Sequence, residues 1–421
     1  MDKFLIEKSG PLCGTVRTGG AKNSCLPLMA AALLTDSTVV LENVPGLVDV
    51  STMTQVLENL GVKVRSETGR ITLDASAAKG CTAPYELVRR MRASYYVLGP
   101  LVARKGQAEV SLPGGCAIGQ RAMDFHLKGL EALGAKIDTS GGFIHARAEM
   151  GLTGTRIDLS GPHGSSVGAT INVMMAASLA RGETIIERAA REPEVVDMAE
   201  MLNRMGAEVR GAGGDTVRIS GKQRLGGAVH QVIPDRIEAG TFAVAAAITG
   251  GEVFIEGCRP DHLGTVIRLL ERTGVAVEQY EHSLRVRRNG ALKPFDIITE
   301  PYPGFPTDMQ AQFCALATRA AGVSTIVETI FENRFLHVPE LVRMGAEMEV
   351  SGRQVTIHGP TTLSAAPVMA SDLRASAALV LAALVAEGTS EINRIYHLDR
   401  GYENLEAKLT RLGARILRVS D

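Results

Sequence analysis

The sequence contains no tryptophan, and aromatic residues make up only 4% of its 421 residues. A chain of this length is too long for a single hydrophobic core and suits two domains of ordinary size. Because 45% of the residues are nonetheless apolar, we expect large cores built mainly from Ala, Val, Leu and Ile.

An excess of one charge is also missing, since the formal net charge is −1. The strongly basic footprint of nucleic-acid-binding proteins is therefore absent, and we expect no nucleic-acid partner. No apolar run reaches the roughly 18 residues that a membrane span requires, and no secretory h-region opens the sequence. We expect a cytoplasmic protein with no membrane partner.

Cysteines are few and widely spread, and their spacing fits neither a metal site nor a disulfide framework. They are Cys13, Cys25, Cys81, Cys116, Cys258 and Cys314. No Walker or dinucleotide-binding fingerprint occurs either. We therefore expect reduced thiols, no metal and no cofactor.

One short phrase recurs six times: the end of an apolar helix, a Leu, Met or Thr followed by Gly, and then a strand. The six glycines are Gly61, Gly134, Gly206, Gly274, Gly345 and Gly413. Successive glycines are 73, 72, 68, 71 and 68 residues apart. A period of about 70 residues is too long for a solenoid repeat and long enough for a small α/β module.

A second pattern recurs in step with the first. Small-residue helices precede a polar or glycine stop and a β-rich run, as in Leu26–Leu34, Ala169–Ala180, Ala239–Ile248 and Ala375–Ala386. The glycines that follow fit C′ positions, and helices apolar almost all round should be buried. The second helix of each unit, such as Met198–Met205 or Leu263–Thr273, should face solvent. Each unit thus reads strand–helix–strand–helix–strand–strand.

The last unit stops after Ala414–Val419 without the return strand that the other five possess. The apolar run Phe4–Glu7 has no unit of its own and could supply it. We therefore predict two α/β domains of three repeated βαβαββ units each, with pseudo-sixfold repetition. Residues 22–233 would form the first, and residues 1–21 and 234–421 the second.

Cys116 is the cysteine with unusual surroundings. It follows the expected strand Ala108–Leu112 and lies among Gly114, Gly115 and Gly119, which favour a loop that can move. Arg121 is five residues away, and a nearby cation favours the thiolate. The residues alone leave two readings open, a reactive thiol and an ordinary loop cysteine.

Four basic residues lie near the expected start of a unit's first helix: Lys22, Arg92, Arg236 and Arg374. A basic residue there opposes the helix dipole, so four in corresponding positions suggest an anion site. They could instead be solvated charges, or pair with neighbours such as Glu238 or Asp372. Asp308 similarly reads either as a catalytic carboxylate on a proline-stiffened loop or as a helix-start acid.

A specific resemblance rests on segments that occur in order along the chain. They are Gly19–Asn23, Pro113–Gly119 (Pro-Gly-Gly-Cys-Ala-Ile-Gly), Ala189–Glu194, Pro306–Gln310 and Asp399–Glu403. Together they resemble the UDP-N-acetylglucosamine enolpyruvyl transferases over essentially the whole chain. The family fold has two inside-out α/β domains of three units each, with the active site in the interdomain cleft.

The resemblance implies transfer of the enolpyruvyl group of phosphoenolpyruvate to the 3-hydroxyl of UDP-N-acetylglucosamine, with release of phosphate. This addition–elimination, the first committed step of peptidoglycan synthesis, needs a general acid, a general base and cations. By resemblance, Cys116 is the acid, can add covalently to phosphoenolpyruvate, and reacts with fosfomycin. Asp308 would be the base near the sugar hydroxyl.

The same resemblance assigns the binding residues. Lys22 and Asn23 would contact phosphoenolpyruvate, with Arg121 and Arg400 completing the anion site, and Lys22 and Arg400 count as catalytic. The residues expected to bind substrate also include Arg92, Arg121, Ala122, Met123, Asp124, Phe125, Gly164, Ser165, Ser166, Val167, Asp308, Ile330 and Arg374.

One position departs from the family pattern. Many relatives carry a lysine where this chain has Gly164, placed to meet the diphosphate. Backbone N–H groups and the hydroxyls of Ser165 and Ser166 remain available there, and His163 is a possible substitute. Two rival functions are a 5-enolpyruvylshikimate-3-phosphate synthase-like transferase, which would not be expected to carry the Cys116 loop, and a non-catalytic paralogue that binds UDP-sugars.

Overall fold

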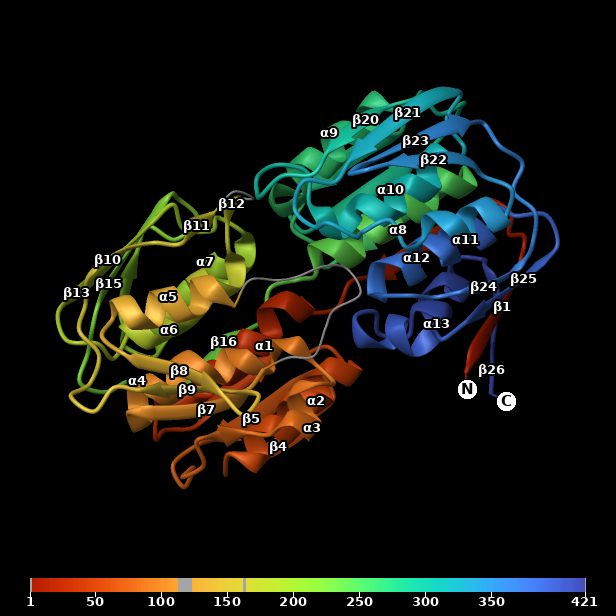
Figure 1. The fold of residues 1–421 in the computed structure, drawn as a ribbon. Coiled ribbons are helices and arrows are strands. Elements are labelled where there is room, and N and C mark those ends of the chain that lie inside the picture. The colour runs from red at the N-terminus through yellow and green to blue at the C-terminus, as the bar shows by residue number, and fades with distance from the viewer. Residues whose placement is uncertain (1, 113–122, 162–163, 421) are drawn as a thin grey trace. The chain divides into compact units, whose positions relative to one another are not determined.

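The computed structural model describes residues 2–112, 123–161 and 164–420. The chain divides into two compact units, with boundaries between Gly19 and Gly20 and between Ile233 and Pro234 (Figure 1). The first domain runs from Gly20 to Ile233, so it begins two residues before the position expected from the sequence. The second domain combines the N-terminal residues with the segment that follows Ile233.

Three four-stranded sheets in each domain repeat one topology within the described residues. The unit of β6, β7, β8 and β9 shows it: the first two strands are parallel, and the last two form an antiparallel hairpin with β9 beside β7. One helix follows each of the first two strands. The predicted α/β fold of repeated βαβαββ units is therefore confirmed.

The first domain has these helices: α1 (Lys22–Ala31), α2 (Val48–Asn59), α3 (Tyr85–Val88), α4 (Leu98–Lys105), α5 (Asp124–Ala132), α6 (Val167–Ala177) and α7 (Pro193–Arg204), with 3₁₀ turns η1 (Ala32–Leu34) and η2 (Arg92–Val97). Its strands are β3 (Val39–Glu42), β4 (Lys63–Glu67), β5 (Arg70–Asp74), β6 (Thr82–Ala83), β7 (Gln107–Ser111), β8 (Lys136–Ser140), β9 (Phe143–Arg147), β10 (Arg156–Asp158), β11 (Ser160–Gly161), β12 (Gly164–Ser165), β13 (Glu183–Glu187), β14 (Glu208–Arg210), β15 (Thr216–Ser220) and β16 (Ala228–Gln231).

The second domain has these helices: α8 (Arg236–Thr249), α9 (Gly264–Arg272), α10 (Gln310–Ala317), α11 (Val338–Arg343), α12 (Leu373–Ala383) and α13 (Leu405–Arg411), with η3 (Pro260–Leu263), η4 (Thr307–Met309) and η5 (Ile395–Arg400). Its strands are β1 (Lys3–Glu7), β2 (Cys13–Arg17), β17 (Glu252–Glu256), β18 (Ala276–Tyr280), β19 (Ser283–Arg287), β20 (Asp296–Ile298), β21 (Gly322–Val327), β22 (Glu347–Ser351), β23 (Gln354–Gly359), β24 (Pro367–Met369), β25 (Thr389–Asn393) and β26 (Arg415–Val419).

Strands remote in sequence complete three of the sheets. β1 lies between β25 and β26 and pairs antiparallel with both, so the N-terminus supplies the missing return strand as predicted. β2 runs parallel to β17 as the first strand of the fourth unit. In the same way, β16 comes from the end of the first domain and runs parallel to β3 in its first unit. The sequence patterns did not reveal the pairings of β2 and β16.

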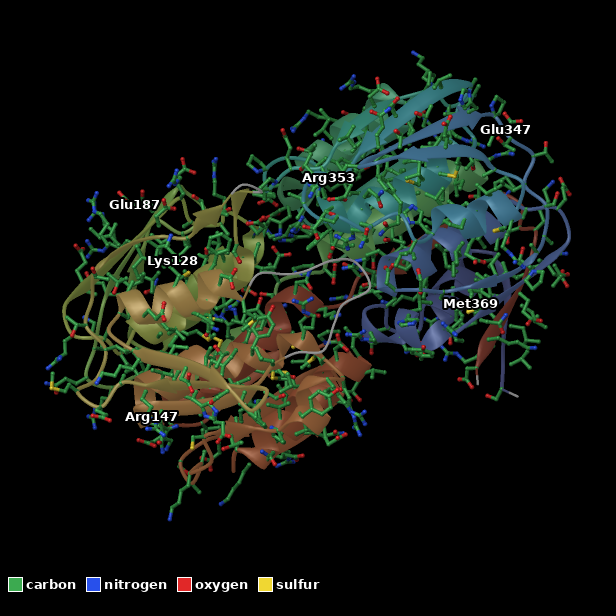
Figure 2. The ribbon with its side chains drawn as sticks, in the orientation of Figure 1. Lys128, Arg147, Glu187, Glu347, Arg353 and Met369 are labelled. Carbon is green, nitrogen blue, oxygen red and sulfur yellow. The ribbon has the colours of Figure 1, made fainter. Side chains whose placement is uncertain are left out.

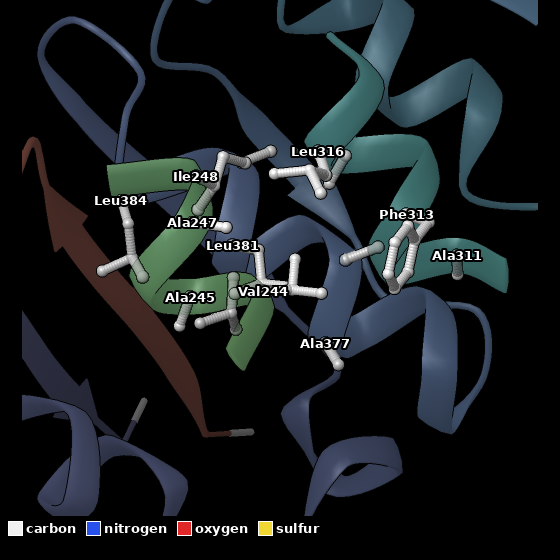
Figure 3. Packing of buried hydrophobic residues seen from close by; sticks show 14 of the residues in the cluster. Val244, Ala245, Ala247, Ile248, Ala311, Phe313, Leu316, Ala377, Leu381 and Leu384 are labelled. Atoms are coloured by element: carbon white, nitrogen blue, oxygen red, sulfur yellow. The ribbon is translucent and has the colours of Figure 1, made fainter. Parts of the chain in front are cut away.

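The small-residue helices form the interior of each domain. In the second domain, α8, α10 and α12 pack on one another, and Val244, Phe313 and Leu381 meet in their shared core (Figure 3). Every residue of α8 from Ile237 to Ile248 is buried. The sheets lie outside these helices and carry charged side chains such as Arg147 and Glu347 on their exposed faces (Figure 2).

Two expectations about the helices were wrong. The helices predicted as Ala169–Ala180 and Ala375–Ala386 end three residues earlier, at Ala177 and Ala383, because short turns separate them from the next strands. Gly182 and Gly388 therefore lie directly before strands β13 and β25, in a left-handed conformation, and do not end helices. Of the predicted C′ glycines, Gly250 does follow its helix directly, with φ 75°.

The second helices are not uniformly exposed. In α9 only one face is buried, as expected, through Val266, Ile267, Leu269 and Leu270. In α7, by contrast, Glu194 and Asp197 are buried together with the apolar residues. The reason is that α7 packs against α1 and α6 as well as its own sheet.

Candidate active site

Asp308 lies in η4, directly before α10, and its carboxylate joins two arginines from distant segments. Oδ1 accepts a hydrogen bond from Arg334 Nη2 at 2.7 Å, and Oδ2 accepts one from Arg374 Nη2 at 2.9 Å. The Asp308 side chain is 22% exposed, whereas both arginine side chains are buried. The N-cap of α10 is Met309, and Asp308 is the acidic residue in the first turn of η4, so it stands at a helix start as well as between two arginines.

The electrostatics of this group follow from the two guanidiniums. Burial alone would raise the pKa of the Asp308 carboxyl, but the charges and hydrogen bonds of Arg374 and Arg334 hold it well below its usual range. Burial likewise opposes the charge on Arg374, and Asp308 outweighs that effect and raises the Arg374 pKa. The carboxylate is therefore ionised, and two positive charges face one negative charge.

Arg374 retains unused hydrogen-bonding capacity. Its Nε and Nη1 atoms are buried and have no hydrogen-bond partner among the described residues. The expected alternative of a pair with Asp372 is wrong, because the Asp372 carboxylate instead caps α12 by accepting from the backbone N–H groups of Arg374 and Ala375. Glu238 pairs with Lys408 at 2.6 Å.

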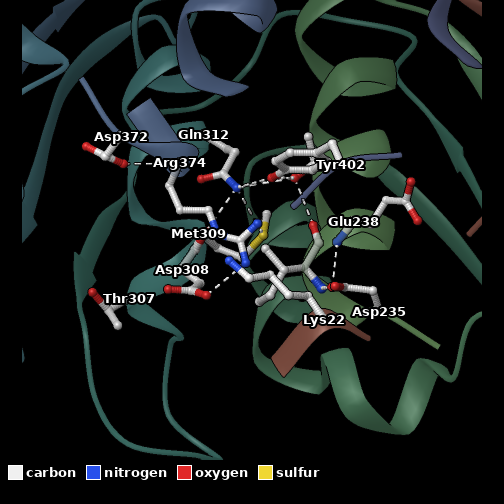
Figure 4. Close-up of polar contacts among 12 residues, drawn as sticks. Lys22, Asp235, Glu238, Thr307, Asp308, Met309, Gln312, Asp372, Arg374 and Tyr402 are labelled. Atoms are coloured by element: carbon white, nitrogen blue, oxygen red, sulfur yellow. Dashed lines mark hydrogen bonds and ion pairs between the residues drawn. The ribbon is translucent and has the colours of Figure 1, made fainter. Parts of the chain in front are cut away.

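A second layer of polar residues supports Asp308 (Figure 4). The Gln312 amide donates to the backbone oxygen of Asp308 at 3.0 Å and to the hydroxyl of Tyr402 at 3.2 Å. That hydroxyl also lies 2.9 Å from Thr241 Oγ1. The Arg374 guanidinium sits 5.4 Å from the centre of the Tyr402 ring, within cation–π range.

Glu328 orders the segment that contains Ile330. It is almost fully buried directly after β21, and its carboxylate accepts from Ile330 N at 2.8 Å and from Phe331 N at 3.1 Å. Its other oxygen accepts from Thr307 Oγ1 at 2.7 Å, and Arg334 Nη1 donates to the same hydroxyl at 2.7 Å. Ile330 and Asp308 thus share one framework within the second domain.

Lys22 and Asn23 begin α1 in the first domain. The Lys22 ammonium pairs with the buried Asp49 carboxylate at 2.6 Å. The N-cap is Ala21, whose side chain offers no acceptor to the first N–H groups of the helix. The α1 N-terminus therefore combines a cation with backbone donors, an arrangement suited to an anion.

The other predicted site residues of the first domain lie at the starts of helices and turns. Arg92 opens η2, not α4, and Met123 is the N-cap of α5, which Asp124 and Phe125 begin. Gly164 and Ser165 form β12, where Gly164 has φ 93°. Ser166 caps α6 by accepting from Ala169 N at 3.3 Å, and Val167 is the first helical residue.

Several predicted residues cannot be placed in this framework. Cys116, Arg121, Ala122 and His163 lie outside the described residues. Arg400 is the last residue of η5 in the second domain.

In the described parts of the chain, no group of three or more His, Cys, Asp or Glu residues could hold a metal ion, and no helix is long and apolar enough to cross a membrane.

Sequence reasoning missed Arg334, Glu328 and Asp49. A signal existed for Glu328, because a lone carboxylate directly follows the half-buried strand β21. Arg334 and Asp49 carried no such signal, since each looks like an ordinary charged residue beside a helix or turn.

Comparison with known proteins assigns this fold to a class of enzyme. A family model described as EPSP synthase (3-phosphoshikimate 1-carboxyvinyltransferase) matches residues 6–409. Among solved structures, the enolpyruvyl transferase NikO from Streptomyces tendae is similar with a TM-score of 0.90 and 28% identity, covering 100% of this chain and 99% of that one. EPSP synthase from Acinetobacter baumannii shares the fold with a TM-score of 0.76 and 21% identity, with both chains covered completely. The class is therefore that of the enolpyruvyl (carboxyvinyl) transferases.

Full-length relatives narrow the assignment. The UDP-N-acetylglucosamine 1-carboxyvinyltransferase of Gluconobacter oxydans is 56% identical, with 100% of both chains covered. The protein of the same name from Acidobacterium capsulatum is 54% identical over 100% of this chain and 97% of its own. The chain belongs to the UDP-N-acetylglucosamine 1-carboxyvinyltransferases, within the EPSP synthase family.

Proposed function

We propose that this enzyme transfers the enolpyruvyl group of phosphoenolpyruvate to the 3-hydroxyl of UDP-N-acetylglucosamine and releases phosphate, the first committed step of peptidoglycan synthesis. The observation that carries the proposal is the position of Asp308 in a Pro-Thr-Asp-Met-Gln segment between two buried guanidiniums. Relatives more than 50% identical over their full length bear the name of this activity, which adds support.

Capture of phosphoenolpyruvate is assigned to α1. Its phosphate and carboxylate are strong hydrogen-bond acceptors, and the Lys22 ammonium at the positive end of the helix dipole supplies a matching donor. Asn23 adds an amide, while Arg121 and Arg400 are proposed to complete the anion site. An incoming anion would draw Lys22 from its ion pair with Asp49.

Asp308 is proposed as the general base, yet a carboxylate with a strongly lowered pKa is a weak one. The contact with Arg374 offers a way to make the Asp308 carboxylate more basic. An anionic substrate that draws the Arg374 guanidinium toward itself, and so exposes the Nε and Nη1 donors that are buried here, would weaken its hold on Asp308. The pKa of Asp308 would then rise toward the value that proton abstraction requires.

The reaction balances with two protein groups. The sugar oxygen forms a bond to C2 of phosphoenolpyruvate as its proton passes to Asp308, and C3 takes a proton from the Cys116 thiol. The C2–O bond to phosphate then breaks, the Cys116 thiolate takes a proton back from C3 as the double bond re-forms, and the proton held by Asp308 leaves with the released phosphate. The Cys116 thiolate can alternatively bond to C2, which gives the expected covalent adduct.

The resulting prediction for Asp308 is kinetic. Asp308→Ala should lower kcat by about 10²–10⁴-fold, the usual contribution of a positioned acid–base group. Lys22→Ala and Arg400→Ala should mainly raise the KM for phosphoenolpyruvate, because their charges act before and during the reaction. Phosphate release with UDP-N-acetylglucosamine as acceptor measures both effects. Arg415→Ala, which alters an exposed arginine paired with Glu7, is the control.

Two outcomes would contradict this assignment. Normal turnover by Asp308→Ala at saturating substrate would leave the base elsewhere. Phosphate release with shikimate 3-phosphate in place of UDP-N-acetylglucosamine would favour the rival synthase activity, and nucleotide-sugar binding without turnover would favour the non-catalytic paralogue.

Fosfomycin labelling tests Cys116 by a different route. Burial, with the charge of Asp197, raises the pKa of Cys25 to about 12, and burial raises that of Cys258 to about 11. Burial raises the pKa of Cys314 as well. We expect a single adduct at Cys116 by peptide mass mapping. Labelling at the exposed Cys13 or the half-buried Cys81 would contradict the prediction.

A further inference from the structure

A buried amide in the first domain joins three separate segments. Asn172 lies in α6 and is fully buried. Its Oδ1 accepts from Gly99 N at 2.8 Å, and its Nδ2 donates to Tyr95 O at 3.2 Å. The same Nδ2 lies 3.1 Å from His126 Nδ1. Since Oδ1 is occupied by an N–H donor, the amide must present its NH₂ group to Tyr95 and His126.

The charge and the tautomer of the His126 ring follow from its surroundings and from this hydrogen-bond network. Burial and the positive charge of Arg92 lower its pKa to about 3, so the ring is neutral at pH 7. Nδ1 accepts from Asn172, which leaves the ring proton on Nε2. Nε2 faces the first turn of α6, because a Cβ atom placed on Gly168 would come within 3.0 Å of it. The ring also stacks edge-on against Tyr95, with centres 4.8 Å apart.

The segments that meet here are the ones expected to bind the nucleotide sugar. Arg92 opens the turn that leads to Tyr95, and Met123–Phe125 directly precede His126. Gly164–Val167 directly precede Gly168. The Phe125 ring adds a further link, because a Cβ atom on Gly161 would lie 2.3 Å from its Cζ.

We propose that His126 and Asn172 are positioning residues for a nucleoside-diphosphate sugar, fixing these three segments relative to one another. This inference rests on the proposed function. The segment Gly164–Val167 carries no charged side chain, so it can hold a diphosphate only through backbone N–H groups and the hydroxyls of Ser165 and Ser166. Such directional hydrogen bonds weaken steeply when misaligned.

Three variants test the inference. His126→Leu removes the acceptor for Asn172, while His126→Gln can retain one. Ser178→Ala is the matched control, because Ser178 is buried at the end of the same helix and its hydroxyl donates within that helix, to Met174 O at 2.9 Å. We expect His126→Leu to raise the calorimetric Kd for UDP-N-acetylglucosamine by about 10- to 100-fold, the usual effect of losing one well-aligned hydrogen bond to a charged group. His126→Gln should recover part of this loss.

Two further readouts separate positioning from general damage. The KM for phosphoenolpyruvate at saturating UDP-N-acetylglucosamine should stay within about twofold in all three variants. Hydrogen exchange of the ligand-free protein should quicken at residues 124–127 and 167–172 in His126→Leu and not in Ser178→Ala. Equal losses for both substrates, an equal effect of Ser178→Ala, or unchanged binding and exchange in His126→Leu would each overturn the inference. Wild-type protein that fails to bind UDP-N-acetylglucosamine would instead overturn the proposed function.

Discussion

Buried ionisable groups in this protein have their protonation fixed by contacts from other segments. Asp308 is ionised because two guanidiniums reach it, whereas His126 is neutral because burial and Arg92 both disfavour its positive charge. The surroundings of Asp308 thus favour the charged form of its side chain, and those of His126 favour the neutral form. Because each pKa differs between the folded and unfolded states, each residue makes the free energy of unfolding depend on pH.

The His126 contribution can be measured directly. An unfolded histidine has a pKa near 6.5, so between pH 7 and pH 5 the unfolded chain binds a proton that the folded ring, with a pKa of about 3, does not. Stability is therefore present above pH 6.5 and falls as the pH drops, by about 2 kcal/mol at pH 5. His126→Gln should remove this part of the acid destabilisation, as measured by denaturant unfolding at the two pH values.

The control for this prediction is His282→Gln, because His282 is exposed and meets solvent in both states. It should leave the pH dependence of stability unchanged. An identical pH profile for wild type and His126→Gln would mean that His126 binds its proton in the folded state as readily as in the unfolded one.

How far the sequence predicts a site residue depends on where its partners lie. Lys22, Arg236 and Arg374 could be placed at or near helix starts because small-residue helices have a clear local pattern. The pairing of Asp308 with Arg334 and Arg374 could not, since those arginines lie 26 and 66 residues away. Contacts of this kind are set by tertiary packing, and one sequence holds no record of it.

At the scale of elements, the six repeated glycines all end helices in the same way. Their φ values range from 89° to 102°, a region open to glycine. In each copy the N–H of the residue after the glycine donates to the carbonyl of the residue five positions before that donor, as Val62 does to Leu57 and Ala414 to Leu409. This bond, from C″ to C3, is the Schellman motif. The sequence phrase thus predicted where these helices end, and the backbone hydrogen bonds give the physical cause.

Gly413→Ala isolates the backbone cost of this motif. Gly413 has φ 102°, and no atom lies within 4 Å of an added Cβ, so strain arises from conformation alone. We expect a loss of about 1 kcal/mol in the free energy of unfolding. Gly290→Ala in the same domain is the control, because its added Cβ also meets open space without a positive φ. Equal stability of the two variants in denaturant titration would contradict the assignment.

At the scale of the whole molecule, the two hydrophobic cores are made from different sets of residues, and the N-terminus belongs to the later one. Phe4 and Ile6 are fully buried in the cluster that contains Phe242 and Phe313. Because the sixth unit lacks a return strand of its own, the sequence predicted that the N-terminal strand would complete its sheet. The roles of β2 and β16 were not predictable, because short parallel strands such as Ala-Val-His-Gln have no distinctive pattern and pair with remote partners.

The last prediction follows from this division. Phe313 is fully buried in α10 against Phe295 and Phe305, so Phe313→Ala should cost about 3–5 kcal/mol. Native-state hydrogen exchange should then quicken in β25 and β26 and equally in β1, although β1 lies at the other end of the sequence. Amides of β3, which is much nearer to β1 along the chain, should keep their protection. Met174→Ala in the first core should give the opposite pattern. If β1 exchanged with β3 in these variants, the N-terminal strand would not be an integral part of the second domain's sheet in solution.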